Sequence, residues 1–149
     1  MRAVVQRVKR ANVSVDNKII GEISHGILLL LGVEGNDEEK DLEYMCDKVP
    51  NLRIFEDENG KMNRSLLDVG GSLLVISQFT LLGDARKGRR PSFTEAAQPE
   101  KAIPIYTKFI KTMKDKNIVT QEGEFGADMQ VELVNDGPVT ILLDSKKIF

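Results

Sequence analysis

The sequence predicts an α+β domain built mostly of antiparallel strands. Strand-like segments fill its N-terminal and C-terminal thirds, and two helical segments lie between them on either side of a central strand. Its 149 residues are enough for one domain, 1–149, with a single ordinary core. The hydrophobic content of 41% and the charged content of 30% are those of a soluble globular protein.

The N-terminal third has the alternation of a β-hairpin. Val13, Val15 and Ile19 flank the turn Asp16-Asn17-Lys18, where Asp and Asn tolerate a positive φ. The apolar run from Ile27 to Val33 then predicts a buried central strand.

Two amphipathic helices are predicted. The first has Asn36 as its N-cap, with Glu39 three residues later, and it ends before Pro50. The second covers 99–116, with Pro104 tolerated near its start. Their apolar faces are, in order, Leu42, Met45, Cys46 and Val49, then Ala102, Ile105, Tyr106, Phe109, Ile110 and Met113. Cys46 is therefore expected in the core.

The remaining segments are short strands, turns and one long loop. The predicted strands are 52–55, 72–79, 118–121, 129–134 and 139–143, with a turn at 57–60. The loop 83–98 joins the strand 72–79 to the second helix. Loops of this length inside a compact domain usually serve a function or move.

Composition excludes several kinds of chemistry. One cysteine allows no internal disulfide and no multi-cysteine metal site. The single histidine, His25, lies in a Ser-His-Gly turn, which is more typical of a solvated surface residue than of a catalyst. The longest aliphatic run, Ile27 to Leu31, is far shorter than a membrane span. We therefore expect a cytoplasmic protein without a membrane partner.

Charge is unevenly distributed. A net charge of −2 argues against a protein that coats nucleic acid with its whole surface. The segment 86–90 nevertheless carries four positive residues in five, namely Arg86, Lys87, Arg89 and Arg90. In most proteins such a run is a solvated loop.

Two short motifs stand out. Ser77-Gln78-Phe79-Thr80-Leu81 follows an apolar strand, and Asn135-Asp136-Gly137-Pro138-Val139-Thr140 precedes a β-branched run. Taken alone, the first is a strand end with Phe79 in the core. Taken alone, the second is a turn with a trans Gly-Pro bond.

Together these motifs resemble those of the D-aminoacyl-tRNA deacylases, which hydrolyse the ester of a D-amino acid attached to tRNA. The likeness extends through the loop Gly83 to Phe93 and to Gln6-Arg7-Val8 and Gly60-Lys61-Met62-Asn63. It departs at Gln121-Glu122-Gly123, where the family commonly has Thr before the glycine. The resemblance implies a barrel-like pair of β-sheets with two flanking helices, a homodimer and no cofactor.

The resemblance also assigns the catalytic corner. Ser77, Gln78, Phe79 and Thr80 would form the floor of a pocket for the aminoacyl group and the terminal adenosine. Main-chain N–H groups near Gln78 and Phe79 would bind the ester carbonyl as charge develops on it. Thr80 is the one side chain there able to act as nucleophile, but it has no base, so attack by water with help from the tRNA 2′-hydroxyl is favoured.

Gly137 and Pro138 would form a cis element that reaches into the other subunit's pocket. Its carbonyls would exclude an L side chain, accept D-amino acids broadly and fail to reject glycine. Met129, Phe125, Ala102 and Arg7 match positions that line or brace this pocket. On the residues alone, the favoured interpretations are a core methionine for Met129 and a surface strand arginine for Arg7.

Arg86, Lys87, Arg89 and Arg90 would hold phosphates at the tRNA 3′ end without reading base sequence. The expected partners are thus aminoacyl-tRNA and a second copy of the chain. Two alternatives stay open. One is a non-enzymatic module that grips RNA or DNA through the basic run. The other is a related deacylase for a small L-amino acid, with a trans Gly-Pro bond.

Overall fold

The computed structural model describes residues 1–149. It contains eight strands, three α-helices and one 3-10 helix. In chain order these are β1 (Arg2–Val15), β2 (Lys18–Ile23), β3 (Gly26–Gly32), α1 (Glu39–Asn51), β4 (Phe55–Glu56), β5 (Met62–Arg64), α2 (Leu66–Val69), β6 (Ser72–Ser77), the 3-10 helix (Phe79–Leu82), α3 (Pro99–Asp115), β7 (Thr120–Glu122) and β8 (Gln130–Asp144).

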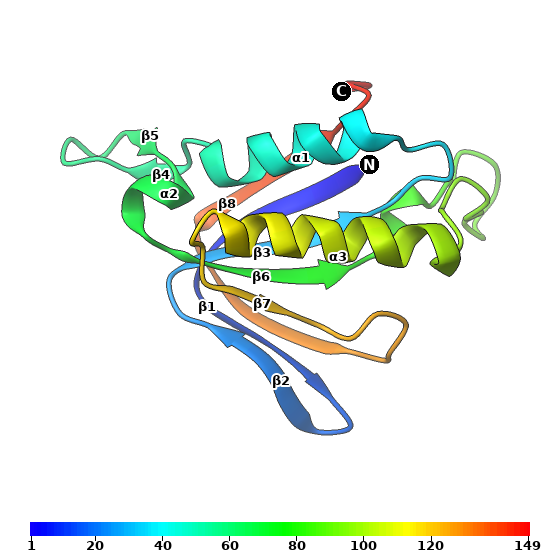
Figure 1. Ribbon diagram of the computed structural model, residues 1–149, viewed down its shortest axis with the longest axis horizontal. Helices are drawn as coiled ribbons and strands as arrows, with labels where there is room; N and C mark the ends of the chain where they lie inside the picture. The colour runs from blue at the N-terminus through cyan, green and yellow to red at the C-terminus, as the bar shows by residue number, and fades with distance from the viewer.

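Strand β1 is the centre of a six-stranded sheet. Its first half pairs with β3 and its second half with β2, while β8 runs along its other edge. The order continues through β3, β6 and β7. Strand β2 then comes back against β7, since a Cβ on Gly21 would lie 2.9 Å from the carbonyl oxygen of Glu122. The sheet is therefore a nearly closed barrel (Figure 1).

The predicted fold class is confirmed in outline and differs in two details. The pairs of β1 with β2, β3 and β8 are antiparallel, but β3, β6 and β7 are parallel to one another. Parallel neighbours need crossover connections, and α1 and α3 lie on the two that are used here. Instead of two comparable sheets, the chain forms the barrel and a separate two-stranded sheet of β4 and β5.

The main core lies between the barrel and the two long helices, which pack side by side (Figure 1). The predicted inner face of α3 is confirmed at Ala102, Tyr106, Phe109, Ile110 and Met113, all buried, and Ile105 packs at its margin. The predicted face of α1 is buried too, at Leu42, Met45, Cys46 and Val49. Burial raises the pKa of the Cys46 thiol, as expected of a core cysteine. A smaller apolar cluster fills the barrel interior.

Helix α1 begins later than predicted. Asn36 does not cap it, because the Asn36 side chain bonds Lys146 instead. The helix starts at Glu39, and the Glu38 N–H donates to Asp41 Oδ2 at 2.8 Å. Pro50 does not end the helix, which continues to Asn51.

The central segment also departs from prediction. The expected strand 52–55 is displaced to β4, because the Leu52 N–H still closes the last turn of α1 on Lys48 O. The short helix α2 was not predicted, although Ser65 and Asp68 form its capping box. Strand β6 ends at Ser77, two residues before the predicted end, and Phe79 opens the 3-10 helix.

At the C-terminus, the predicted strands 129–134 and 139–143 are one strand, β8. Pairing with β1 continues on both sides of Gly137-Pro138, with register shifts between Gln6 and Val8 and between Val8 and Arg10. Such shifts let a strand accommodate a proline that cannot donate to the ladder. The Asp16-Asn17 turn is confirmed, with φ values of 50° and 63°.

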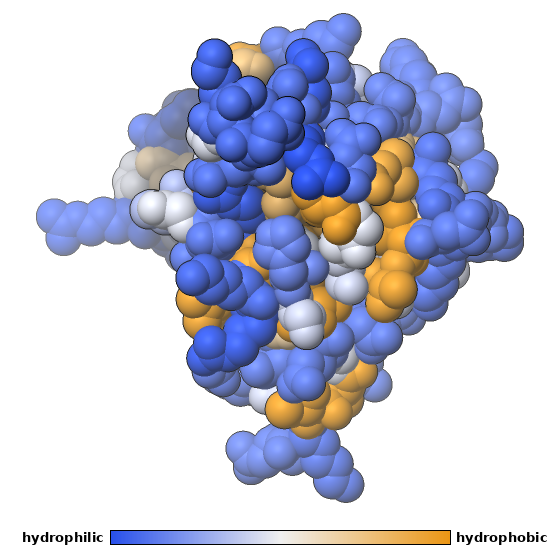
Figure 2. Space-filling view, turned by 90° about the vertical axis from the view of Figure 1, so that its left-hand side faces the viewer, coloured by the Kyte–Doolittle hydropathy of each residue, from blue (hydrophilic) through white to orange (hydrophobic).

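The end of the molecule that carries α2 and the β4–β5 hairpin is mainly hydrophilic, with apolar side chains in separate strips (Figure 2). Met62 and Leu67 are the large apolar residues exposed from these elements. None of the three α-helices has the length and apolar character needed to cross a membrane.

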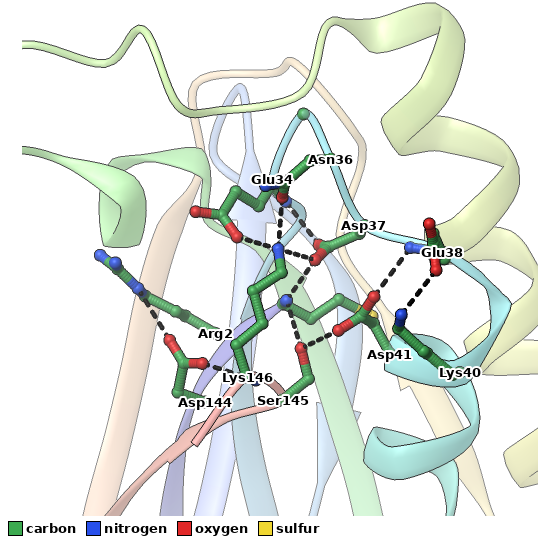
Figure 3. A network of polar contacts seen from close by, with 12 residues as sticks. Arg2, Glu34, Asn36, Asp37, Glu38, Lys40, Asp41, Asp144, Ser145 and Lys146 are labelled. Carbon is green, nitrogen blue, oxygen red and sulfur yellow. Dashed lines mark hydrogen bonds and ion pairs between the residues drawn. The ribbon is translucent and has the colours of Figure 1, made fainter. Parts of the chain in front are cut away.

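A buried ion pair joins the start of β1 to the loop that follows β3 (Figure 3). The Met1 ammonium donates to Asp37 Oδ1 at 2.6 Å and to Ser145 Oγ at 2.7 Å, and both members of the ion pair are fully buried. Lys146 also contacts Asp37, at 3.0 Å. Ser145 in turn donates to Asp41 Oδ1 at 2.6 Å. Burial acts to raise the pKa of Asp41, but this bond and that from Glu38 N–H outweigh it and lower that pKa.

We expect Asp37→Asn to lower the free energy of unfolding by about 3 kcal/mol, because the Met1 ammonium stays buried without its counter-charge. Urea unfolding at pH 7 measures the loss. The matched control is Asp115→Asn, which removes only the exposed ion pair with Lys111 and should leave the midpoint within error of wild type. Equal stabilities for Asp37→Asn and wild type would contradict the structural role of this ion pair.

Candidate active site

The first motif forms a tight corner at the end of β6. Gln78 N–H donates to Leu31 O at 2.8 Å, which continues the pairing of β6 with β3. Leu81 N–H then donates to Gln78 O at 3.2 Å and closes the first turn of the 3-10 helix. The first N–H groups of a helix have no partner within it. Those of Phe79 and Thr80 are therefore available to a ligand, whereas that of Gln78 is already used.

The side chains of the corner include no general base. The Gln78 amide nitrogen donates to Thr80 Oγ1, and such a nitrogen cannot accept a proton. No histidine, lysine or carboxylate hydrogen-bonds to Thr80. The interpretation of Phe79 as a core residue is wrong, because 57% of it is exposed.

Arg2 supports the corner from strand β1. Its Nη1 donates to Leu81 O at 3.1 Å, and its Nε donates to Asp144 Oδ2 at 3.2 Å. Arg2 thus ties the 3-10 helix to the end of β8. Sequence reasoning missed this residue, because no local pattern marks an arginine whose partners lie 79 and 142 positions away.

A cavity of about 280 Å³ opens beside the corner. Ser77, Gln78 and Phe79 line one side of it, and Ala102 with Tyr106 on α3 lines another. The segment after β7 adds Phe125, Gly126, Ala127 and Met129 to the lining. The structure thus brings six of the predicted site residues together: Ser77, Gln78, Phe79, Ala102, Phe125 and Met129. Thr80 is next to them in the chain but outside the lining.

The walls of this cavity are apolar and tightly fixed. Tyr106 OH donates to Val75 O at 2.8 Å, and burial raises the pKa of Tyr106, so the phenol is neutral at pH 7. The Phe125 ring packs edge-on against Tyr106, with centroids 6.1 Å apart. Met129 lies so close to Gly123 that a Cβ there would be 2.5 Å from its sulfur. The cavity therefore suits an apolar group.

The second motif lies elsewhere on the chain. The Gly137-Pro138 bond is cis, as the resemblance implies, and both residues are exposed. Asn135 bridges the element, with its Oδ1 accepting from Val139 N–H at 2.7 Å. Neither Gly137 nor Pro138 lines the cavity, so one chain does not bring the two motifs together.

Arg7 braces this element from below. It is only 6% exposed, so its interpretation as a surface arginine is wrong. Its Nε donates to Asp136 O at 2.8 Å and its Nη1 to Ile54 O at 2.7 Å. Arg7 does not line the first cavity. It lines a second, polar cavity of about 330 Å³, together with His25 and Asp136. His25 itself is exposed, as predicted, and packs edge-on against Phe55.

The basic loop is held at its stem and charged at its tip. Asp84 and Ser92 exchange two main-chain bonds, of 2.7 and 2.9 Å. Arg86 folds back on Asp84, with its Nε at 2.8 Å and its Nη2 at 2.7 Å, and these bonds lower the pKa of that carboxyl. The remaining cations of the run, Lys87, Arg89 and Arg90, are exposed and form no ion pair.

These features define a class of protein: a barrel-like α+β domain with an apolar ligand cavity at a strand end, edged by free main-chain N–H groups. The sequence matches the family model "D-Tyr-tRNA(Tyr) deacylase" over residues 4–144. The chain therefore belongs to the D-Tyr-tRNA(Tyr) deacylase family and is a hydrolase.

Curated relatives are similar in sequence to this chain over their whole length. Proteins named D-aminoacyl-tRNA deacylase from Thermosipho africanus, Clostridioides difficile and Clostridium kluyveri are 59%, 61% and 63% identical, with 100% of both chains covered. The predicted family resemblance is confirmed.

Two solved structures share the fold. One, named c-Myc DNA Unwinding Element Binding Protein, has a TM-score of 0.91 and 44% identity, over 97% of this chain and 98% of that one. Another, described as a probable eukaryotic D-amino acid tRNA deacylase, has a TM-score of 0.80 over 95% of this chain and 97% of that one. Its identity is 16%, so it shows the fold alone.

We expect Arg7→Met to lower the free energy of unfolding by about 2–3 kcal/mol, because the carbonyls of Asp136 and Ile54 lose their buried donor. Urea unfolding measures the change. Arg10→Met is the matched control, since Arg10 is exposed on the same strand and makes no side-chain hydrogen bond. If both variants unfold at the wild-type urea concentration, Arg7 does not brace the Gly-Pro element.

Proposed function

We propose that this chain hydrolyses the ester of D-aminoacyl-tRNA in the cytoplasm and releases the free D-amino acid and tRNA. One observation carries the proposal: the apolar cavity lies against the 3-10 turn whose first N–H groups, those of Phe79 and Thr80, are open to a ligand. The names of the full-length relatives support the substrate. The protein would thus serve quality control in translation.

The chemistry rests on the main chain. The ester carbonyl oxygen lies at the N–H groups of Phe79 and Thr80, which stabilise the negative charge formed when water attacks the carbonyl carbon. Each such donor contributes about 3 kcal/mol. The acyl–oxygen bond then breaks, the ribose oxygen takes one proton of the water, the other proton goes to solvent, and the D-amino acid leaves as its carboxylate. The neighbouring 2′-hydroxyl of the ribose assists the water, because the corner supplies no base of its own. Thr80 has a positioning role in this scheme, and its hydroxyl accepts a hydrogen bond from the Gln78 amide.

The cavity receives the terminal adenosine. Phe125, Met129 and Ala102 supply apolar walls for a flat base, and Tyr106 is neutral and tied to Val75. Enclosing the base here places its ribose, and the ester on it, toward Ser77 and Phe79. No cofactor enters this scheme.

Handedness is selected by a second copy of the chain. Gly137 and Pro138 are exposed and lie outside their own cavity, while the buried Arg7 and the half-buried Asn135 hold the element. In a homodimer, the main-chain carbonyls of Gly137 and Pro138 reach the partner's cavity and face the substrate's α-carbon. An L side chain collides with them, whereas a D side chain points away. Glycine has no side chain to exclude, so glycyl-tRNA is a further substrate.

The wild-type protein should hydrolyse D-tyrosyl-tRNA and leave L-tyrosyl-tRNA intact. Thr80→Ala should keep D-tyrosyl-tRNA hydrolysis within about tenfold of wild type, because the main-chain donors remain. Release of labelled tyrosine measures both activities. Thr107→Ala, at an exposed position of α3, is the matched control.

Complete loss of activity in Thr80→Ala would restore Thr80 as nucleophile. Faster hydrolysis of the L ester would instead favour a deacylase for L-amino acids. If neither ester is cleaved while RNA or DNA binds, the chain is a binding module without this activity.

Replacing Lys87, Arg89 and Arg90 by Ala should weaken tRNA binding and reduce the slope of log affinity against log salt by about 2, because each phosphate contact contributes ~0.7–0.9 to that slope. Filter binding from low to moderate salt measures it. The matched control replaces Lys108, Lys111 and Lys114 on α3, which already pair with carboxylates. An unchanged slope would remove the basic loop from the RNA contact.

A further inference from the structure

Two exposed aromatic rings lie beside the cavity. Phe79 is 57% exposed and Phe93 is 37% exposed, and their rings meet edge to face with centroids 5.3 Å apart. Phe93 is fixed by a close approach to Gly83, where a Cβ would lie 3.0 Å from its ring. Two large apolar rings held together at the surface are costly to leave in water, which points to a ligand.

The pair connects two parts of the site. Phe79 lines the cavity, and Phe93 directly follows Ser92, which bonds Asp84 at the stem of the basic loop. A chain that leaves the cavity toward the loop tip therefore passes over the two rings. In the proposed function, the two ends of this path bind the same tRNA: the cavity binds its terminal adenosine and the loop binds its phosphates.

The charges along the path are complementary to a polyanion. Lys87, Arg89 and Arg90 carry free positive charge at the tip. Arg86 neutralises Asp84 through their ion pair. Glu95 is the other carboxylate whose negative charge acts on Arg86. An apolar pair of rings next to unpaired cations is the arrangement that binds single-stranded nucleic acid, whose bases stack while its phosphates meet the cations.

We propose that Phe79 and Phe93 form a stacking site for the unpaired base that precedes the terminal adenosine of the RNA. The inference rests on the proposed function and deepens it, because it adds a second nucleotide to the substrate that is recognised. Ring faces accept any base, so this contact adds affinity without reading sequence. The terminal base lies in the cavity, the preceding base lies on the rings, and their phosphates lead to the basic loop.

The kinetic test compares a long and a short substrate. For Phe93→Leu, we expect kcat/KM for D-tyrosyl-tRNA to fall about tenfold relative to kcat/KM for 3′-D-tyrosyl adenosine, which has no second base; one stacked base accounts for a loss of this size. Phe93→Trp keeps an aromatic ring and should keep the ratio. Phe149→Leu, at an exposed phenylalanine of the C-terminus, is the matched control.

The binding test uses the absence of tryptophan from the chain. In Phe93→Trp the introduced indole is the only one, so its fluorescence reports on this position. An RNA that ends in CCA and carries no amino acid should quench this fluorescence. The same RNA with abasic residues in place of the two cytidines should quench it much less. This readout does not depend on how well Phe93→Leu folds.

An unchanged ratio in folded Phe93→Leu, or equal quenching by the two RNAs, would overturn the stacking site. Equal quenching would mean that the rings contact another part of the substrate or the second subunit. Failure of the proposed function looks different, because the wild-type protein would then cleave neither ester. In that case the quenching comparison alone decides whether the rings bind a base.

Discussion

Strand β1 holds both motifs of the site. It is paired along both edges, with β2 and β3 on one side and β8 on the other, so its backbone has little freedom. Its start is anchored by the buried pair of Met1 and Asp37. From this rigid strand, Arg2 reaches the carbonyl of Leu81 at the corner after β6, and Arg7 reaches the carbonyl of Asp136 beside Gly137. Successive side chains of a strand point to opposite faces, so residues 2 and 7, an odd number apart, serve opposite sides of the sheet. The two motifs are therefore held firmly but apart, and this separation is why the proposed selection of handedness needs a second copy.

The proposed site works with main-chain groups where many hydrolases use side chains. The Gln78 amide occupies the Thr80 hydroxyl, and the Tyr106 phenol is neutral and bonded to Val75. What is left at the corner is a pair of N–H dipoles at the start of a 3-10 helix, beside an apolar cavity. Dipoles in a dry, apolar site act more strongly on developing charge than they do in water. An ester of an amino acid is already reactive, so in the proposed reaction this help acts together with the ribose 2′-hydroxyl and without a general base from the protein.

Local patterns in the sequence predicted what depends on local structure. The Asp16-Asn17 turn and the buried face of α3 follow from residue type and helical period, and both are confirmed. Prediction was wrong where a distant group competes for a side chain: Asn36 was expected to cap α1 but bonds Lys146, 110 positions away. Arg7 was taken for a surface residue when judged by its neighbours alone, because its acceptors, at 54 and 136, come together only in the folded sheet. Phe125, Ala102 and Met129 came from family resemblance, and no local pattern would have joined them in one cavity.

The modes of recognition in the proposed site share one property: none of them depends on which amino acid or which base is bound. Main-chain carbonyls of Gly137 and Pro138 sense where a side chain points but not what it is. Aromatic faces accept any base, and the cations of the loop accept any phosphate. Such a site suits a substrate class defined by its ester and its handedness rather than by one amino acid or one tRNA. Under the proposed function, a protein with a net charge of −2 can bind RNA because positive charge is needed only at the basic loop.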